Sequence, residues 1–291
     1  MPKKILLQTT IPTTSDDWDI ARFHLLSEFL DGQQAADGSK LFQVTARDRD
    51  GAAGPDSLLA RIDETDFDQV WLFAVDTGTG LSPEDCAAIS RFRRRGGGLL
   101  VARDHMDLGS SLCSLGGVGL ANHFHSKNPE SDPLRRRIDD PFTTAILWPN
   151  YHSGANGDYQ EISPAGDLHP VLRDSTNPQQ ALRFLPSHPH EGAVSAPTDN
   201  ATARVIATGR SKITGVDFNI AVAFEPDEEN GPAVAQSTFH HFVDYNWDVG
   251  SGAPSFVSEP PGRSLAERPE AMTSTKSYMR NLALWLSGLV V

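Results

Sequence analysis

Hydrophobic and polar positions in the first hundred residues follow two different periods, and together they predict an α/β fold. Three short apolar runs have strand character: 5–7, 41–45 and 68–75. The third run is apolar on both faces, which is typical of a central parallel strand. Apolar residues recur at helical spacing in three further segments: 18–30, 58–62 and 83–95. This alternation predicts a flavodoxin-like three-layer α/β/α sandwich around a mainly parallel sheet.

The periodicity is lost between residues 110 and 200, where Gly, Pro, Asn and Asp interrupt the chain. Because this stretch is too long for a bare loop in a compact domain, we interpret it as a loop-rich insertion over the carboxyl edge of the sheet. Two brief strands are expected inside it, near 145–148 and 181–185. Regular strands are expected again at 203–208, 220–224 and 233–239.

The C-terminal part of the chain completes the predicted domain. The Pro-, Ser- and Gly-rich segment 251–269 is typical of a surface connector, and 273–289 predicts a helix that docks its apolar face on the sheet. We expect residues 1–291 to form a single domain, because the chain has room for one large core.

Polar residues follow two of the predicted strands where apolar ones could have continued. After Gly96-Gly97-Gly98 and a short apolar run, the chain reads Asp104-His105-Met106-Asp107. The preceding strand likewise ends in Asp76-Thr77-Gly78. Ligands of α/β proteins bind at the carboxyl ends of parallel strands. Asp104 and His105 are therefore candidate catalytic residues, and Asp76, Thr77 and Gly78 are candidate substrate-binding residues.

Ten histidines are present, and several lie in pairs: His123 and His125, His188 and His190, and His240 and His241. Imidazole titrates near neutral pH and is the commonest metal ligand, so this concentration suggests chemistry. In extended chain His188 and His190 point the same way, next to Glu191. If His240 and His241 continue a strand, they face opposite sides and only one of them can enter a site. The sequence does not decide which one.

Four motifs carry a family resemblance: the 67–73 strand with Asp76-Thr77-Gly78, the Gly96–Gly98 strand with Asp104-His105, the stretch 185–192, and the stretch 237–242. Together they resemble a largely uncharacterised bacterial group of the class I glutamine amidotransferase-like superfamily, similar to the trehalose-utilisation (ThuA-like) proteins. The resemblance covers about residues 66 to 248. It implies a flavodoxin-like fold, and it implies no particular activity.

One departure from the superfamily pattern excludes an activity. Glutamine amidotransferases carry a nucleophilic Cys in a Gly-x-Cys-x-Gly elbow after this strand, whereas this chain reads Ala102-Arg103-Asp104-His105-Met106. Without a thiolate no glutaminyl thioester forms. We therefore expect no glutamine amidotransferase activity.

Charge and composition narrow the partners. The formal net charge of −13 opposes binding to nucleic acid or to an anionic membrane surface. No apolar run approaches the roughly 18 residues that span a bilayer. Two cysteines, Cys86 and Cys113, fit a reducing compartment, so we expect a cytoplasmic protein. A small neutral or cationic molecule is the expected ligand, and a homo-oligomer is compatible with the sequence.

Our leading hypothesis is a small-molecule hydrolase. Asp104 orients His105; His105, His188, His190 or His240 acts as general base, and Glu191 is a second acid or base. In a metal-assisted variant, His188, His190 and one of His240 or His241 bind zinc, manganese or iron together with Asp104 or Glu191.

Two other hypotheses compete with the hydrolase. One is a noncatalytic carbohydrate- or polyol-binding protein, in which Trp247 and Tyr245 stack on the sugar ring. The other is a scaffold in which the histidines satisfy the backbone of the insertion. All three depend on where the histidines lie in the fold.

Overall fold

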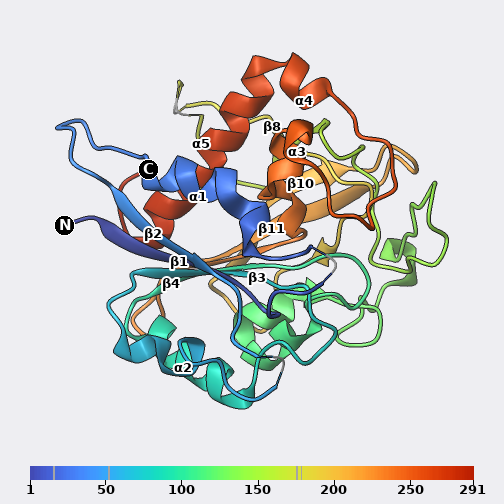
Figure 1. Cartoon of the computed structure of the whole chain (residues 1–291). Coiled ribbons are helices and arrows are strands. Elements are labelled where there is room, and N and C mark those ends of the chain that lie inside the picture. Colours follow the sequence, from blue (N-terminus) through green and yellow to red (C-terminus); the bar gives the residue numbers. More distant parts are fainter. Residues whose placement is uncertain (16, 52, 175, 178) are drawn as a thin grey trace.

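The computed structural model describes residues 1–15, 17–51, 53–174, 176–177 and 179–291 (Figure 1). Its centre is an eight-stranded sheet with the order β2-β1-β3-β4-β12-β11-β10-β7. Five neighbouring strands are parallel: β2 (Phe42–Arg47), β1 (Lys3–Thr9), β3 (Gln69–Phe73), β4 (Gly98–Ala102) and β12 (Ala233–Gln236). The remaining three pair antiparallel: β11 (Asp217–Phe224), β10 (Ala203–Arg210) and β7 (Ser163–Pro164). The mainly parallel sheet and α/β class predicted from the sequence are confirmed.

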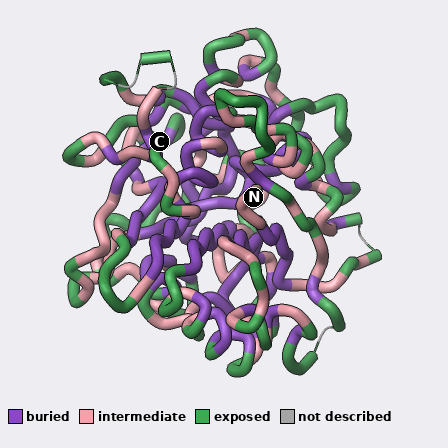
Figure 2. The backbone as a smooth tube through the Cα atoms, turned by 90° about the vertical axis from the view of Figure 1, so that its left-hand side faces the viewer, coloured by how far each residue is buried: buried purple, intermediate pink, exposed green. Residues whose placement is uncertain are grey.

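Helices cover both faces of the sheet and make three layers (Figure 1). One face carries α1 (His24–Asp31) and α5 (Pro269–Leu286), and the other carries α2 (Pro83–Arg94). Short 3-10 helices join the α2 side: η2 (Leu59–Glu64), η3 (Ser110–Leu115) and η4 (Gly117–Ala121). Side chains of the central strands alternate between the two cores, so that Trp71 and Phe73 pack on the α1 side and Leu72 and Val101 on the α2 side. Figure 2 shows these strands as the buried interior.

The predicted helices differ from the observed ones mainly at their ends. The first begins as the 3-10 turn η1 (Ile20–Phe23), where the Asp19 side chain accepts a hydrogen bond from the Ala21 amide. Helix α2 is capped by Ser82, whose hydroxyl accepts from the Asp85 amide while the Asp85 carboxylate accepts from the Ser82 amide. Helix α5 begins at Pro269, four residues before the expected 273. Among the described residues, no helix is long and apolar enough to cross a membrane.

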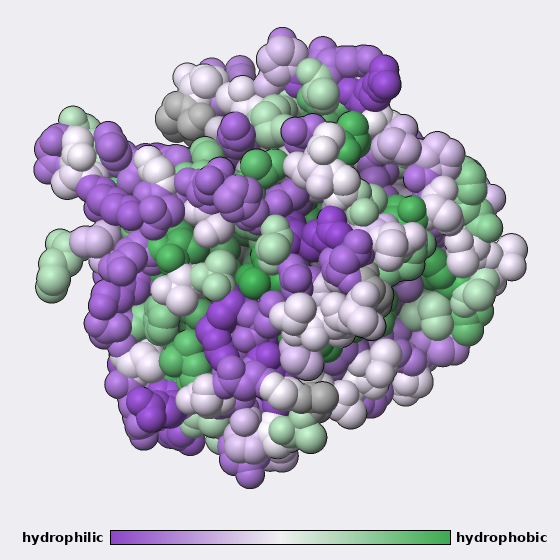
Figure 3. Space-filling view, viewed as in Figure 1, coloured by the Kyte–Doolittle hydropathy of each residue, from purple (hydrophilic) through white to green (hydrophobic). Residues whose placement is uncertain are grey.

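The stretch 110–200 consists of short elements joined by turns. Besides η3, η4 and β7 it holds β5 (Asn122–His123), η5 (Pro133–Arg135), β6 (Tyr159–Glu161), η6 (Pro170–Leu172), β8 (Phe184–Pro186) and β9 (Ala193–Val194). The prediction of a strand near 145–148 is wrong, because the Ile146 amide donates to the Thr143 carbonyl and closes a turn instead. Hydrophobic residues at the right-hand margin of Figure 3 lie over these loops. Strands β5 and β9, and β6 and β8, pair antiparallel beside the main sheet.

The chain between the sheet and α5 passes over the carboxyl edge. After β12 come η7 (Phe239–His241), α3 (Asp244–Trp247) and η8 (Val249–Ser251), and then α4 (Ser264–Glu267) within the predicted connector. Hydrogen bonds attach the connector to the rest of the protein at two places. The Gly252 carbonyl accepts from Arg22, and the Gly262 amide donates to the Asn156 carbonyl. Segment 252–262, which we call the strap, therefore has a fixed path over the sheet edge.

Candidate functional site

A cavity of about 440 Å³ lies at the carboxyl edge of the parallel strands. Its walls come from the residues that follow β1, β3, β4 and β12, from the insertion and from the strap. The polar residues in its wall are Thr14, Asp104, His105, Thr143, Asn156, His188, His190, His240, Tyr245, Ser258 and Glu259. The histidines after β4, in the insertion and after β12 are separated by long stretches of sequence, and the fold brings them together here.

Asp104 lies at the centre of the polar side of this cavity, two residues after β4. Its Oδ2 atom is 3.4 Å from His240 Nε2 and 3.5 Å from His105 Nε2, and its Oδ1 atom is 3.7 Å from His188 Nε2. Burial raises the pKa of Asp104, but the neighbouring His105 and His240 outweigh burial and lower it to about 2. Asp104 is thus a buried carboxylate at neutral pH.

His188 and His240 present their Nε2 atoms to this carboxylate. Their rings stack with centroids 3.3 Å apart and planes 10° from parallel. The other nitrogen of each ring makes a hydrogen bond to a neighbouring side chain: His188 Nδ1 is 2.9 Å from Asn156 Oδ1, and His240 Nδ1 is 2.9 Å from the Tyr245 hydroxyl. Burial, together with the neighbouring His240, lowers the pKa of His188 well below its ordinary value. His188 is therefore neutral, with a proton on Nδ1 and a lone pair on Nε2.

The ligand-type atoms of Asp104, His188 and His240 all lie within 4.8 Å of one another. Among the described residues, Asp104 Oδ1 and His188 Nε2 are both buried without a hydrogen-bond partner. Both atoms are hydrogen-bond acceptors, so neither satisfies the other. Because Asn156 and Tyr245 contact the Nδ1 atoms, the Nε2 atoms of His188 and His240 both face Asp104, and His240 Nε2 is within hydrogen-bond distance of Asp104 Oδ2. A partner on the far nitrogen is the usual arrangement around metal-binding histidines.

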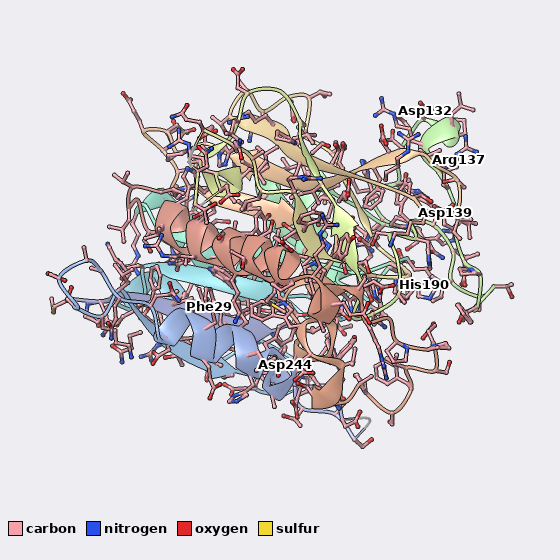
Figure 4. The ribbon with its side chains drawn as sticks, turned by 90° about the horizontal axis from the view of Figure 1, so that it is seen from above. Phe29, Asp132, Arg137, Asp139, His190 and Asp244 are labelled. Atoms are coloured by element: carbon pink, nitrogen blue, oxygen red, sulfur yellow. The ribbon has the colours of Figure 1, made fainter. Side chains whose placement is uncertain are left out.

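His190 lies on another side of the same cavity and pairs with the strap. Its Nε2 atom is 3.1 Å from Glu259 Oε1, and its Nδ1 atom is 3.3 Å from Asn150 Oδ1. The Asn150 amide nitrogen donates to the Ile146 carbonyl, which turns Oδ1 toward the ring. Both ring nitrogens therefore face acceptors, and the His190–Glu259 pair must hold a proton between them. Figure 4 places His190 beyond the end of α5, on the side where the loop with Asp132, Arg137 and Asp139 projects.

His105 lines the cavity between these groups. Its ring centroid is 5.8 Å from that of His190, and burial lowers the pKa of the His105 imidazole. Its Nδ1 atom is buried and makes no hydrogen bond to the described residues. A neutral imidazole with a free ring nitrogen can accept a proton from a substrate or from water.

Glu191 and His241 lie outside the cavity, in a buried polar cluster of their own. His241 Nε2 is 3.4 Å from Glu191 Oε2, and Glu191 also accepts from Ser153 and Ser237. The Tyr278 hydroxyl donates to Gln236 Oε1, so Gln236 Nε2 donates to His241 Nδ1 at 2.7 Å. Gln160 Nε2 lies 3.0 Å from His241 Nε2, so both ring nitrogens of His241 contact side-chain amides beside Glu191.

The question left open by the His240-His241 pair is thus answered by η7. Thr238 caps this turn with its side chain, and the two rings leave it in different directions. His240 reaches Asp104, whereas His241 is fully buried beside Glu191. Of the four ligands expected from the sequence, His188 and His240 are in the cluster, His190 lies across the cavity and His241 is outside it.

The candidate substrate-binding residues also lie elsewhere. The buried Asp76 side chain accepts from Thr10, from the Gly78 amide and from the amide and hydroxyl of Ser111, so it joins the loops after the strands. Neither Thr77 nor Gly78 contributes to the described wall of the cavity. Trp247 is 5% exposed, donates its indole N–H to the His241 carbonyl and packs edge-on against Phe29.

Sequence reasoning missed two residues of the site, Asn156 and Glu259. Asn156 stands between Gly154 and Gly157 with no periodic pattern around it, and Glu259 lies in the strap among Pro and Ser. Both act through contacts with histidines more than thirty positions away in sequence. Only their place in the fold identifies them.

Two further residues hold the loops of the site in place. The guanidinium of Arg103, fully buried, donates to the carbonyls of Met106, Leu108 and His123 and lies 4.1 Å over the Phe124 ring. Burial lowers the pKa of Arg103 to about 9, which leaves it charged at neutral pH. At Gly192 a Cβ atom would lie 2.2 Å from the Ser237 carbonyl oxygen and 2.8 Å from that of Asp104. Only glycine lets the insertion approach the two strand ends this closely.

Comparison with known proteins supports the fold. No protein-family model matches the sequence, and no curated protein matches it by sequence. Among solved structures, a putative ThuA-like protein from Parabacteroides merdae is similar over 100% of this chain and 92% of its own, with 10% identity and a TM-score of 0.51. The glutaminase domain of Trypanosoma brucei CTPS aligns over 97% of this chain and 94% of its own, with 17% identity and a TM-score of 0.48.

The likeness to the ThuA-like protein shows a shared fold. The resemblance found in the sequence motifs is thereby confirmed at the level of the fold. Neither cysteine lies in the described wall of the cavity, and the place after β4 is taken by Asp104.

Proposed function

We propose that this chain, with the fold of a ThuA-like protein, is a metal-dependent hydrolase of a small molecule. Asp104, His188 and His240 are the ligands of its divalent cation. The observation that carries the proposal is a pair of acceptors, Asp104 Oδ1 and His188 Nε2, which are buried, 3.7 Å apart and without a hydrogen-bond partner in the described part of the chain.

A cation explains this pair better than packing does. A buried polar atom without a partner costs about 1–3 kcal/mol, and two acceptors that face each other cannot share a hydrogen bond. One divalent cation between the carboxylate and the two imidazoles satisfies all three groups. Two nitrogens and one carboxylate oxygen also form a ligand set that leaves positions open for water and substrate. Zinc, manganese and iron all accept such a set, as the sequence hypothesis expected.

The chemistry follows from the other groups in the cavity. A bound divalent cation polarises a carbonyl and lowers the pKa of a bound water. His105 supports the site from beside Asp104, with a free Nδ1 that accepts a proton. The His190–Glu259 pair holds a proton and lies across the cavity, where it can protonate a leaving group. A positioned acid or base of this kind contributes about 10²–10⁴ in rate.

The carbohydrate-binding alternative depended on an aromatic platform at Trp247. Because the Trp247 ring packs inside the protein and its N–H is used by the His241 carbonyl, it offers no face to a ligand in this cavity. The Tyr245 hydroxyl is held at His240 Nδ1. These contacts favour the hydrolase.

The test measures metal binding first and turnover second. Calorimetry and elemental analysis after dialysis against Zn²⁺, Mn²⁺ or Fe²⁺ should find one ion per wild-type chain. Asp104→Asn, which keeps the shape and removes the charge, should lose at least about tenfold in affinity, the range typical of a damaged metal site. The matched control is Asp107→Asn in the same loop, because the Asp107 side chain accepts a hydrogen bond from the Ser126 amide and lies outside the described wall of the cavity.

Turnover is then screened with a panel of small esters and amides. Hydrolysis should require the added ion and should fall in Asp104→Asn but not in Asp107→Asn. Equal metal affinity in wild type and Asp104→Asn would contradict the proposed ligand set. If one metal ion binds per chain but no member of the panel is hydrolysed, the proposed hydrolase is contradicted and the proposed metal centre is supported.

A further inference from the structure

The cavity has two chemically different ends, and the strand order separates them. The neighbours in the sheet are β1, β3, β4 and β12. Ile11 follows β1 and Val75 follows β3, whereas Asp104 follows β4 and His240 follows β12. Since neighbouring strands lie about 4.8 Å apart, the ends of β1 and β4 are roughly 10 Å apart along the sheet edge. The proposed metal ligands therefore lie beside the ends of β4 and β12, and an apolar wall extends from Phe239, next to His240, toward the ends of β3 and β1.

The apolar wall is formed by packed side chains that other contacts hold in place. Trp18 lies against Phe239, with ring centroids 5.0 Å apart, and against Phe23 at 5.9 Å. Ile11 and Val75 are only partly buried by the protein, so they have surface left for a ligand. Above them the strap adds Phe256 and Val257 to the cavity wall. Phe256 is 60% exposed, so part of its ring is also open to solvent.

This arrangement disfavours a ligand that is polar throughout. A polyhydroxylated molecule that filled the cavity would bury hydroxyl groups against Ile11, Trp18 and Val75, and each unpaired group costs about 1–3 kcal/mol. The Thr14 hydroxyl at this end already donates to the Trp18 carbonyl. An alkyl or aryl group gains free energy from the same surface, because its apolar area leaves water.

We propose that the substrate is a carboxylic ester or amide with a compact alkyl or aryl group, which packs against Ile11, Trp18 and Val75 while the scissile carbonyl lies at Asp104, His188 and His240. This inference rests on the proposed metal centre and adds the substrate class to it. Ile11 and Val75 are then the residues that determine specificity. Sugars and polyols are poor ligands of the cavity.

The test uses two hydroxamic acids, which chelate a protein-bound metal ion through the same head group and differ in their tails. Acetohydroxamate carries a methyl group and benzohydroxamate a phenyl ring. Calorimetry on the zinc-loaded full chain measures both, with each value corrected for the affinity of the compound for free zinc. Wild type should bind benzohydroxamate at least about tenfold more tightly, since burying about 60 Å² of additional apolar surface has that effect.

Two variants of the wall locate the preference. Val75→Phe fills the apolar part of the cavity and should lower the affinity for benzohydroxamate much more than that for acetohydroxamate, which abolishes the preference. Ile11→Thr keeps a β-branched shape and makes the wall more polar, so it should reduce the preference for benzohydroxamate over acetohydroxamate about threefold. This variant serves as the test if Val75→Phe does not fold. Asp104→Asn should weaken both compounds.

The outcomes separate this inference from the proposed function. Equal corrected affinities in wild type, or a preference that neither wall variant changes, would overturn the substrate class and leave the metal centre standing. Failure of both hydroxamates to bind zinc-loaded protein would overturn the metal centre and the inference with it. Tight benzohydroxamate binding that Asp104→Asn does not weaken would place the compound elsewhere and overturn both.

Discussion

Replacing His240 and His241 by alanine, one at a time, should give opposite results although the two residues are adjacent. His240 lines the cavity and contacts Asp104, whereas His241 is fully buried and contacts Gln236 and Glu191. We expect His240→Ala to abolish metal binding and to change stability little. His241→Ala should strongly lower the free energy of unfolding of the metal-free protein.

The magnitudes follow from what each variant leaves without a partner. His241→Ala removes the ring contacts of two buried side-chain amides, Gln236 Nε2 and Gln160 Nε2. Two buried groups left unsatisfied cost about 1–3 kcal/mol each, so with the new cavity we expect a loss of about 3–5 kcal/mol. His240→Ala removes a partner of the Tyr245 hydroxyl and of Asp104 Oδ2, but both residues line the cavity, so we expect water that enters the space of the ring to replace these hydrogen bonds. Its expected cost is about 1 kcal/mol or less.

The assay is urea denaturation in the presence of a chelator, followed by zinc calorimetry at a temperature where each variant is folded. His24→Ala is the matched control, because this histidine is exposed on α1 far from the cavity wall. His241→Ala should bind zinc like wild type once it is folded. The reasoning is refuted if His240→Ala keeps its zinc affinity, or if the two variants lose the same stability.

Three further predictions concern residues outside the proposed ligand set: His169, which caps η6 and lies against Trp285, and then Arg103 and Gly192. Burial, with help from nearby arginines, lowers the pKa of His169 to about 3, so its neutral form stabilises the fold fully above the unfolded pKa of about 6.5 and less as pH falls below it. Glu225 lies 3.3 Å from His169 and offsets part of this loss of stability at low pH. Between pH 8 and pH 5 the free energy of unfolding of wild type, measured by denaturation, should therefore fall by about 1–2 kcal/mol more than that of His169→Asn. If the free energies of the two proteins change with pH in parallel, this prediction is wrong. Arg103→Met leaves the carbonyls of Met106, Leu108 and His123 without this donor, so it should lower the free energy of unfolding by about 2–4 kcal/mol in denaturation curves. It should also weaken zinc binding in calorimetry. Unchanged zinc affinity would mean that the loop keeps its conformation without Arg103. Gly192→Ala forces a Cβ atom onto the Ser237 carbonyl and should lower the melting temperature by at least about 5 °C, whereas a shift below 1 °C would show that the backbone yields there.

The sheet could be predicted from the sequence because its strands and helices are short-range patterns. The apolar run before Asp76 and the Ser82-Pro83 cap each specify an element within a few residues. The turn at 143–146, where a strand near 145–148 was expected, could not be predicted in this way. Its apolar residues resemble a strand, but the Thr143–Ile146 backbone bond takes the amide that a strand would need.

The site could be predicted only in part, for the same physical reason. That Asp104 and His240 lie together follows from strand order, since polar residues after neighbouring parallel strands meet at one edge. His188 comes from the insertion, after β8, so its place in the cluster does not follow from the order of the main sheet. Whether His240 or His241 enters the site depends on the direction of a single turn, and no periodic pattern in the sequence predicts that direction. Glu259 is placed by the path of the strap, which rests on contacts distant in sequence.

The most direct test of the central claim is anomalous diffraction at the zinc edge from crystals of the zinc-loaded chain. We expect one strong peak, bonded at about 2.0–2.2 Å to a carboxylate oxygen of Asp104 and to the Nε2 atoms of His188 and His240. A peak bound instead by His105 and His190, or no peak at this edge of the sheet in crystals that hold zinc elsewhere, would contradict the account.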